Sequence, residues 1–247
     1  MKRRIPNESI DVIVTSPPYN IGINYNSHKD NMPFEKYLKW MKEFSQECSR
    51  VLKDSGSLFL NIGDKPSDNF RAFDVASEFK KTLELQNTIH WIKSIAIPEK
   101  EITLGHYKPV NSRRFLGNFH EYVFHFTKNR KVMLDKLSLG VPYKHKSNVT
   151  RWKKEKRDLR ERGNVWFIKY ETINGQRGHP AIFPVKLPEM CIKLHGLESS
   201  ERIVVLDPFI GSGSTAVAAK RLGCDYVGFD VDKDYVKFAR TFVKKHP

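Results

Sequence analysis

The chain has 247 residues, 39% hydrophobic and 12% aromatic, which is enough for one large α/β domain with an insertion or for two small domains. Lys and Arg outnumber Asp and Glu by 43 to 28, and the net charge of +15 favours a polyanionic partner. No apolar run approaches the ~18 residues of a membrane span, and three widely separated cysteines without a Cys-x-x-Cys pair disfavour a zinc site and favour a reduced, cytoplasmic protein.

An apolar run near the N-terminus, residues 11–14, is followed at once by two prolines, Pro17 and Pro18. This pattern predicts a buried strand whose carboxyl end opens into a rigid turn, the place where α/β folds put their chemistry. The Ser16 hydroxyl, the bare carbonyls and the Tyr19 ring would suit a flat, amino-bearing ligand, because oxygens accept N–H bonds while a ring stacks. Taken alone, these residues are more simply explained as an ordinary strand-ending turn.

Strands and helices are expected to alternate through the next hundred residues. Helical spacing of apolar residues predicts helices over 34–52 and 70–83, and apolar runs predict strands over 57–64, 88–92 and 121–127. The alternation predicts an α/β fold with a mostly parallel, doubly wound sheet and helices on both faces.

A basic segment follows. Between residues 128 and 162, thirteen basic residues face four acids, a surplus of nine. Aromatic residues are interleaved with them, as expected of a surface that meets phosphates and stacks on bases, although a solvated loop is the alternative. The candidate DNA-binding residues are Lys144, Lys146, Arg151, Trp152, Lys153, Lys154, Lys156 and Arg157.

The C-terminal part returns to α/β alternation. It predicts a helix over 186–195, a strand over 202–206, a glycine-rich turn, a helix with Ser214 or Thr215 as N-cap, a strand over 226–230 and a last helix over 233–243. Glycine turns between a strand and a helix let the backbone approach a ligand closely and aim free N–H groups at it.

The glycine turn fits an adenosine-containing ligand. Gly211, Gly213 and Ala216, with Asp230 following, match the dinucleotide fingerprint in which the acid binds a ribose diol, while the Gly-Lys-Ser/Thr end of a P-loop is absent. Asp207 just before the turn suits a cationic amine better than a pyrophosphate, and S-adenosylmethionine carries both an ammonium group and a ribose diol. The candidate cofactor-binding residues are Asp207, Pro208, Phe209, Gly211, Gly213, Ser214, Thr215 and Asp230.

Together, the turns at 15–20 and 207–215 resemble the catalytic and cofactor motifs of amino-methylating DNA methyltransferases. Their order, catalytic motif first and cofactor motif last with a basic insertion between, resembles the permuted β class of these enzymes. The segments 105–110, 163–166 and 179–184 also resemble this family, so the resemblance covers most of the chain.

The resemblance implies a Rossmann-like methyltransferase fold in three parts. These are a catalytic half over 1–127, a target-recognition insertion over 128–178 and a cofactor-binding half over 179–247. Members of the family usually begin with a further strand before the stretch matching 5–9. We therefore expect a missing edge strand, explained by an upstream start or by a partner subunit.

The expected reaction is direct methyl transfer to the exocyclic amine of a base flipped out of duplex DNA. The candidate catalytic residues are Ser16, Pro17, Pro18 and Tyr19, with Tyr19 stacking on the base and the Ser16 hydroxyl and Pro17 carbonyl accepting its two amino hydrogens. A C5-cytosine mechanism needs a nucleophilic thiol, and none of the three cysteines lies in an evident site.

Ser rather than Asp at position 16 resembles the cytosine-N4 group, so N4 of cytosine is the expected target and N6 of adenine the alternative. An oxidoreductase and a DNA-binding module with a degenerate cofactor site are more remote. The implied partners are double-stranded DNA, a second copy of the chain and a cognate restriction endonuclease.

Three further residues are weaker candidates. Asp64 ends a strand beside the catalytic one, so it is expected near the methionine part of the cofactor or in an exposed loop. His179 and Phe183 border the cofactor by resemblance alone, and a packed turn is the alternative.

Overall fold

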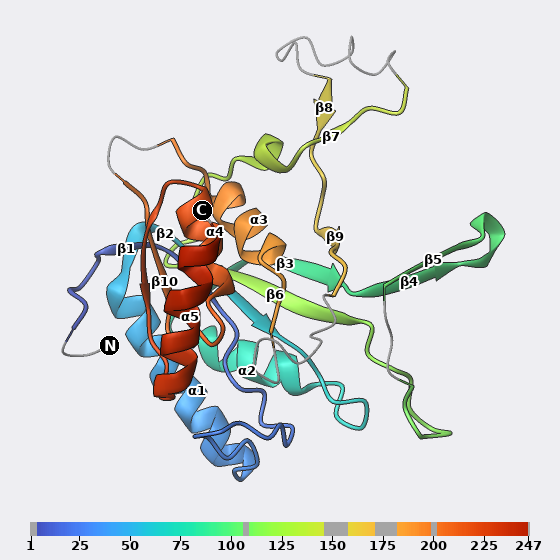
Figure 1. The fold of residues 1–247 in the computed structure, drawn as a ribbon, viewed down its shortest axis with the longest axis horizontal. Helices are drawn as coiled ribbons and strands as arrows, with labels where there is room; N and C mark the ends of the chain where they lie inside the picture. Colours follow the sequence, from blue (N-terminus) through green and yellow to red (C-terminus); the bar gives the residue numbers. More distant parts are fainter. Residues whose placement is uncertain (1–3, 106–108, 146–157, 171–181, 199–201, 247) are drawn as a thin grey trace.

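A seven-stranded sheet with the order β11-β10-β1-β2-β6-β3-β9 forms the centre of the computed structural model, which describes residues 4–105, 109–145, 158–170, 182–198 and 202–246 (Figure 1). Its strands are β1 (Ile10–Thr15), β2 (Leu52–Ile62), β3 (Glu84–Ile92), β6 (His120–Thr127), β9 (Val165–Phe167), β10 (Val204–Asp207) and β11 (Asp225–Gly228).

The sheet is mostly parallel, as predicted. β1 pairs parallel with β10 and with β2, and β10 pairs parallel with β11. β6 is the reversed strand, because it runs antiparallel to both β2 and β3, whereas β9 is parallel to β3. Every residue of β1 is buried, which is typical of a central parallel strand covered on both faces.

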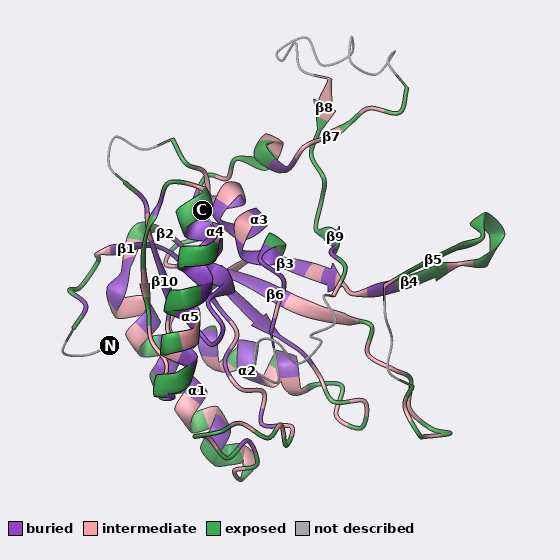
Figure 2. Ribbon diagram, in the orientation of Figure 1, coloured by how far each residue is buried: buried purple, intermediate pink, exposed green. Residues whose placement is uncertain are grey.

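Helices cover both faces of the sheet (Figures 1 and 2). The helices are α1 (Phe34–Val51), α2 (Arg71–Phe79), α3 (Lys186–His195), α4 (Ser214–Arg221) and α5 (Lys233–Lys245). Alternate residues of β1 belong to different cores: Ile13 packs with α1 and α2, and Val12 and Val14 pack with α3, α4 and α5. The predicted doubly wound α/β architecture is therefore confirmed.

One capping prediction was wrong. The N-cap of α4 is Gly213, at φ 92°, and not Ser214 or Thr215. Both hydroxyls bond elsewhere: Ser214 Oγ donates to the Phe183 carbonyl at 2.8 Å, and Thr215 Oγ1 donates to Asp207 Oδ2 at 2.7 Å.

Two hairpins extend from the sheet (Figure 1). The first pairs β4 (Ser94–Ile97) with β5 (Ile102–Gly105) through the 3₁₀ turn η1 (Pro98–Lys100), and no sequence pattern predicted it. The second follows the 3₁₀ turn η2 (Lys136–Leu139) and pairs β7 (Val141–Pro142) with β8 (Leu159–Arg160). The β4–β5 hairpin is largely exposed (Figure 2).

Parts of the segment 128–178 belong to the sheet domain. Leu139 of η2 and Trp166 of β9 are buried in the same core as α3 and α4, and β9 is an edge strand of the sheet. The segment 146–157, which holds seven of the eight candidate DNA-binding residues, lies outside the described residues. None of the helices in the described ranges is long and apolar enough to cross a membrane.

Candidate active site

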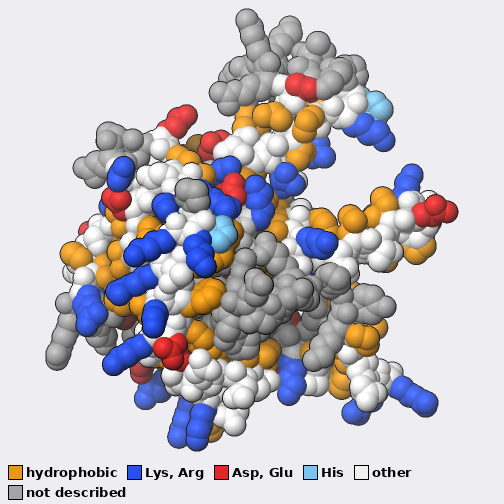
Figure 3. Space-filling view, viewed as in Figure 1, with side chains coloured by type: hydrophobic (Ala, Val, Ile, Leu, Met, Phe, Trp, Pro, Cys, Tyr) orange, Lys and Arg blue, Asp and Glu red, His pale blue; other side chains and the backbone are white. Residues whose placement is uncertain are grey.

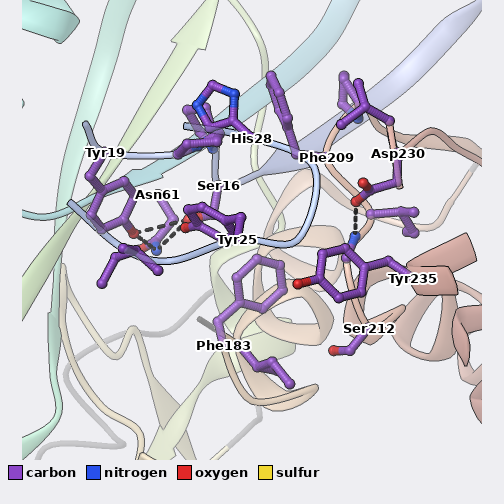
Figure 4. A pocket seen from close by; sticks show the side chains of 18 of the residues that line it. Ser16, Tyr19, Tyr25, His28, Asn61, Phe183, Phe209, Ser212, Asp230 and Tyr235 are labelled. Carbon is purple, nitrogen blue, oxygen red and sulfur yellow. Dashed lines mark hydrogen bonds between the residues drawn. The ribbon is translucent and has the colours of Figure 1, made fainter. Parts of the chain in front are cut away.

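The carboxyl ends of β1 and β10 meet at one edge of the sheet, because the two strands are neighbours and parallel. A cavity of about 760 Å³ opens there, a size typical of small-molecule sites. The predicted site residues that line it are Ser16, Pro17, Pro18, Tyr19, Pro208, Phe209, Gly211, Ser214 and Asp230. Figure 4 shows the turn at 15–20, called the catalytic turn here after its predicted role, and the glycine turn at 207–215 on opposite sides of this cavity.

Other predicted residues lie outside the cavity lining. Gly213 and Thr215 belong to the start of α4. Lys144 is exposed beside β7, and the other seven candidate DNA-binding residues fall in 146–157, outside the described residues. His179 also lies outside the described residues. Phe183 does line the cavity, as the resemblance implied.

Asp207 is buried behind the cavity wall. Its carboxylate accepts hydrogen bonds from Thr15 Oγ1 at 2.9 Å, Thr215 Oγ1 at 2.7 Å and the Phe209 amide at 3.1 Å. Burial raises the pKa of this carboxyl to about 6, although these hydrogen bonds oppose the shift. The carboxylate thus ties β1, β10 and α4 together, and direct contact with a ligand ammonium stays a prediction.

Asp230 lines the cavity and is held by two backbone amides. One carboxylate oxygen accepts from the Gly211 amide at 3.0 Å and the other from the Asp232 amide at 2.9 Å, so the side chain is fixed against the glycine turn (Figure 4). Each oxygen keeps a second lone pair that a ribose hydroxyl could use. Next to it, Asp232 accepts from Ser27 Oγ at 2.8 Å and caps α5.

A loop that sequence reasoning did not single out covers the cavity. The Asp30 carboxylate accepts three backbone N–H bonds, from Asn20 at 2.7 Å and from Ile21 and Ile23 at 3.0 Å each, which curls the chain after the catalytic turn. The curl brings Tyr25, Ser27 and His28 to the cavity, where Trp40 of α1 and Tyr235 of α5 join them. An acid ten residues after Asn20 was the available signal, but it does not reveal its bonding partners.

The catalytic turn carries a hydrogen-bonded cluster. Ser16 Oγ and the Tyr19 hydroxyl lie 2.9 Å apart, and the Tyr19 hydroxyl donates to Glu121 Oε2 at 2.9 Å. Asn61 Nδ2 donates to the Tyr19 hydroxyl at 2.7 Å and to Glu121 Oε2 at 2.8 Å. Burial, followed by the charge of Glu121, raises the pKa of Tyr19 well above its usual range, so this hydroxyl keeps its proton.

Glu121 is held in its charged form. Burial alone would raise the pKa of this carboxyl, but the Lys93 ammonium 2.8 Å from Oε1 and the hydrogen bonds from Lys93, Asn61 and Tyr19 bring it below the usual value. Lys93 also lies over the rings of Trp91, at 5.7 Å from the centroid, and Tyr170, at 6.0 Å.

Sequence reasoning missed Asn61 and Glu121 for different reasons. Asn61 near the end of β2 is on a strand that was predicted, and its polar side chain was the signal. Glu121 is the second residue of β6, and it reaches the carboxyl ends of β1 and β2 because β6 is antiparallel, a direction that a sequence does not reveal. Asp64, by contrast, lies outside the cavity lining and accepts from the Ala72 amide at 2.8 Å at the start of α2.

The described residues contain no group of three or more His, Cys, Asp or Glu side chains able to hold a metal ion. The site therefore offers two functional regions in one cavity: an acceptor-rich, aromatic turn and a glycine turn with a fixed carboxylate.

Comparison with known proteins decides the family. The family model N6_N4_Mtase, described as DNA methylase, matches residues 10–241. The chain belongs to this DNA methylase family. The type II methyltransferase M.BglII of Bacillus subtilis is 31% identical over 256 residues, covering 98% of this chain and 66% of M.BglII. The chain thus spans about two thirds of the length of that relative.

Solved structures share the fold. The cytosine-N4-specific PvuII DNA methyltransferase superimposes with a TM-score of 0.67 at 22% identity, covering 96% of this chain and 80% of that one. The M1.HpyAVI–SAM complex gives 0.55 at 21% identity, covering 95% and 89%. The predicted family is confirmed by the family model, and the predicted methyltransferase fold is shared with these structures. SAM is the ligand named for the M1.HpyAVI complex, and its binding by this chain stays a prediction.

Proposed function

We propose that this chain transfers the methyl group of S-adenosylmethionine to the N4 amine of cytosine in duplex DNA, with N6 of adenine as the alternative target. The observation that carries the proposal is one cavity with an amine-accepting turn on one side and a glycine turn on the other. A donor bound at the glycine turn and a base bound at the Ser16 turn would then face each other, and holding two reactants in line is worth several kcal/mol of barrier.

The cavity suits S-adenosylmethionine chemically. Asp230 offers acceptors for the ribose diol, and the aromatic rings of Tyr25, Phe209 and Tyr235 offer faces for an adenine. When bound, the cofactor supplies a methyl group activated by a positively charged sulfur. The residues of the chain bind it, orient it and exclude water.

The roles proposed in binding the base depend on which oxygens of the catalytic turn are not already hydrogen-bonded within the protein. The Pro18 carbonyl already accepts from the Tyr37 hydroxyl at 2.9 Å. We therefore assign the acceptor role to the Pro17 carbonyl together with the Ser16 hydroxyl, and the Tyr19 ring, fixed through its hydroxyl, is the stacking face. Reaching them requires that the base leave the helix, at a cost of a few kcal/mol.

Direct transfer needs no covalent intermediate, and the cysteines support this. Cys48 and Cys191 are fully buried, and burial raises the pKa of both thiols, so neither supplies a thiolate. The thiol of Cys224 also has a raised pKa, and this residue lies outside the cavity lining.

The deciding experiment identifies the methylated nucleoside. Plasmid DNA from cells that express the chain, in a host without its own N4 or N6 methylation, is digested and analysed by mass spectrometry, with a Ser16→Ala chain as control. N4-methylcytosine that depends on Ser16 is expected. N6-methyladenine would transfer the proposal to adenine, and unmodified DNA together with no transfer by purified protein would reject it.

The proposed partners need separate measurements. Duplex DNA is the proposed substrate, and light scattering at several protein concentrations would test the proposed homodimer. A cognate endonuclease would cut unmodified DNA at the sequence that this chain protects.

A further inference from the structure

Ser16, Tyr19 and Glu121 form a chain of hydrogen bonds that runs from the cavity into the protein. The two links, between Ser16 Oγ and the Tyr19 hydroxyl and from that hydroxyl to Glu121 Oε2, are both 2.9 Å long. The far end is anchored, because Lys93 Nζ donates to Glu121 Oε1 at 2.8 Å.

The direction of each hydrogen bond follows from its neighbours. An ionised Glu121 can only accept, so the single proton of the Tyr19 hydroxyl goes to it. The hydroxyl oxygen then has only acceptor capacity left. Ser16 must therefore donate its own proton to Tyr19, since Tyr19 has none left to give.

Asn61 reinforces this direction. Its amide must turn Nδ2 toward the carboxylate, and its two N–H groups match the two short contacts, to the Tyr19 hydroxyl at 2.7 Å and to Glu121 at 2.8 Å. The contact of Asn61 Nδ2 with Ser16 Oγ is longer, at 3.3 Å, so Ser16 keeps its lone pairs for the cavity.

We propose that Glu121 is a positioning residue that sets the direction of this chain, so that Ser16 presents lone pairs and not a proton to the amine of the target base. This inference rests on the proposed function. The direction matters because a serine hydroxyl can act either way. A hydroxyl that donated to the amine would occupy the nitrogen lone pair that must attack the methyl group.

Two observations show that the cluster is built for a ligand and a fixed geometry. Asn61 lines the cavity, and its Oδ1 is buried without a hydrogen-bond partner among the residues that the structure describes, which a donor group of a bound base would supply. A Cβ on Gly63 would lie 3.2 Å from Tyr19 Cε2 and 3.0 Å from Glu121 Cγ, so the backbone packs directly against both side chains.

The first test replaces the acceptor while keeping its shape. Glu121→Gln introduces an N–H where only an acceptor stood, and we expect the single-turnover methylation rate at saturating DNA and cofactor to fall about 30-fold. Glu121→Asp keeps the charge and should recover part of that rate. Cofactor affinity by calorimetry should stay within about twofold in both, since Glu121 lies on the base side of the cavity. Glu189→Gln is the control: this carboxylate is also paired with lysines, Lys186 and Lys193, but lies on α3 outside the cavity lining.

The second test asks whether Glu121 acts through Tyr19. Tyr19→Phe keeps the ring and removes the link, so it should slow the reaction about as much as Glu121→Gln, and the double variant should be no slower than either. A Glu121→Gln enzyme at the wild-type rate, or losses that multiply in the double variant, would overturn the inference and leave the proposed function standing. A wild-type protein without methyl transfer would overturn both.

Discussion

At the scale of single residues, the carboxylates of Asp207 and Asp230 in the cofactor half have different surroundings. Asp207 is 1% exposed and lies outside the cavity lining, whereas Asp230 lines the cavity. We therefore predict that Asp207 acts mainly on the stability of the glycine turn and that Asp230 acts mainly on ligand affinity. The two roles predict different results for the same change from Asp to Asn.

Replacing Asp207 should alter how stability depends on pH. Burial raises the pKa of this carboxyl from its ordinary value near 4 to about 6, so its contribution to folding is full below pH 4 and is lost as the pH rises through 6. Two units correspond to about 3 kcal/mol. Asp207→Asn removes this titration, and urea unfolding at several pH values should show the variant gaining on the wild type between pH 4 and 6. Parallel stability curves would contradict the prediction.

Replacing Asp230 should act on the cofactor. Asp230→Asn removes a charged acceptor for the ribose diol, and hydrogen bonds to a charged group contribute about 1.5–3 kcal/mol, so the dissociation constant of S-adenosylmethionine should rise about 10-fold or more. Isothermal titration calorimetry measures it. Asp234→Asn, at an exposed position of the first turn of α5, should bind as the wild type does. Equal affinity of all three proteins would remove Asp230 from the ribose site.

At the scale of elements, the glycine turn depends on close packing between α4 and α5. Gly213 has φ 92°, and a Cβ there would lie 3.0 Å from the Ala239 Cβ of α5. Gly223, at φ 70°, has nothing within 4 Å of such a Cβ. The two positions share a left-handed backbone, but α5 packs closely only against Gly213.

This pair predicts unequal losses of stability. Gly223→Ala should lower the free energy of unfolding by about 1–2 kcal/mol for its backbone conformation alone. Gly213→Ala should lose a further 1–3 kcal/mol, roughly, because α5 must move away. Urea denaturation measures both, and equal losses would show that α5 adapts without cost.

A buried polar link joins β6, β2 and α3. Ser57 Oγ lies 3.0 Å from His125 Nε2 and 2.9 Å from His195 Nδ1. Burial, followed by the nearby His195, lowers the pKa of His125 to about 3, so this ring stays neutral in the fold. An unfolded chain protonates it near pH 6.5.

This link predicts acid lability. Because the pKa of His125 is lower in the folded state, its contribution to folding is present above pH 6.5 and is lost as the pH falls toward 3. The loss amounts to about 2 kcal/mol by pH 5. His125→Gln should be less stable at pH 7.5 but should lose less on acidification. Chemical denaturation at pH 7.5 and 5 tests this, and an identical acid loss would assign the effect to other groups.

At the scale of the whole molecule, positive charge dominates the described surface. Figure 3 shows Lys and Arg side chains gathered over α5, where Lys233, Lys237, Arg240 and Lys244 follow one another along the helix. With a net charge of +15, phosphate contacts should contribute much of any DNA affinity.

Binding to duplex DNA should therefore weaken steeply with salt. Each neutralised phosphate contributes about −0.9 to the slope of log K against log salt concentration, so six contacts give a slope of about −5. Fluorescence anisotropy with a short duplex, at salt concentrations from about 50 to 200 mM, measures this slope. A slope near zero would show that the basic surface does not meet the phosphates.

Much of the fold was predictable because local patterns agreed with the final packing. The apolar spacing that predicted a helix over 34–52 matches α1, and the glycine turn does join β10 to α4. The reversed direction of β6 and the β4–β5 hairpin were not predictable, because strand direction and pairing depend on contacts between distant residues.

The sequence by itself determined the family and the two turns of the site, because each turn is a short run whose residue types indicate its chemistry. Ser16 to Tyr19 provide hydrogen-bond acceptors and an aromatic face, and Gly211 and Gly213 leave the backbone accessible. Only the tertiary structure decided what stands behind those turns. It buried Asp207, whose carboxylate links β1, β10 and α4 by hydrogen bonds. Because β6 is antiparallel, it also placed Glu121 within hydrogen-bond distance of Tyr19, more than a hundred residues away in the chain. The reason is physical: a hydrogen bond has a direction only once all its partners are known.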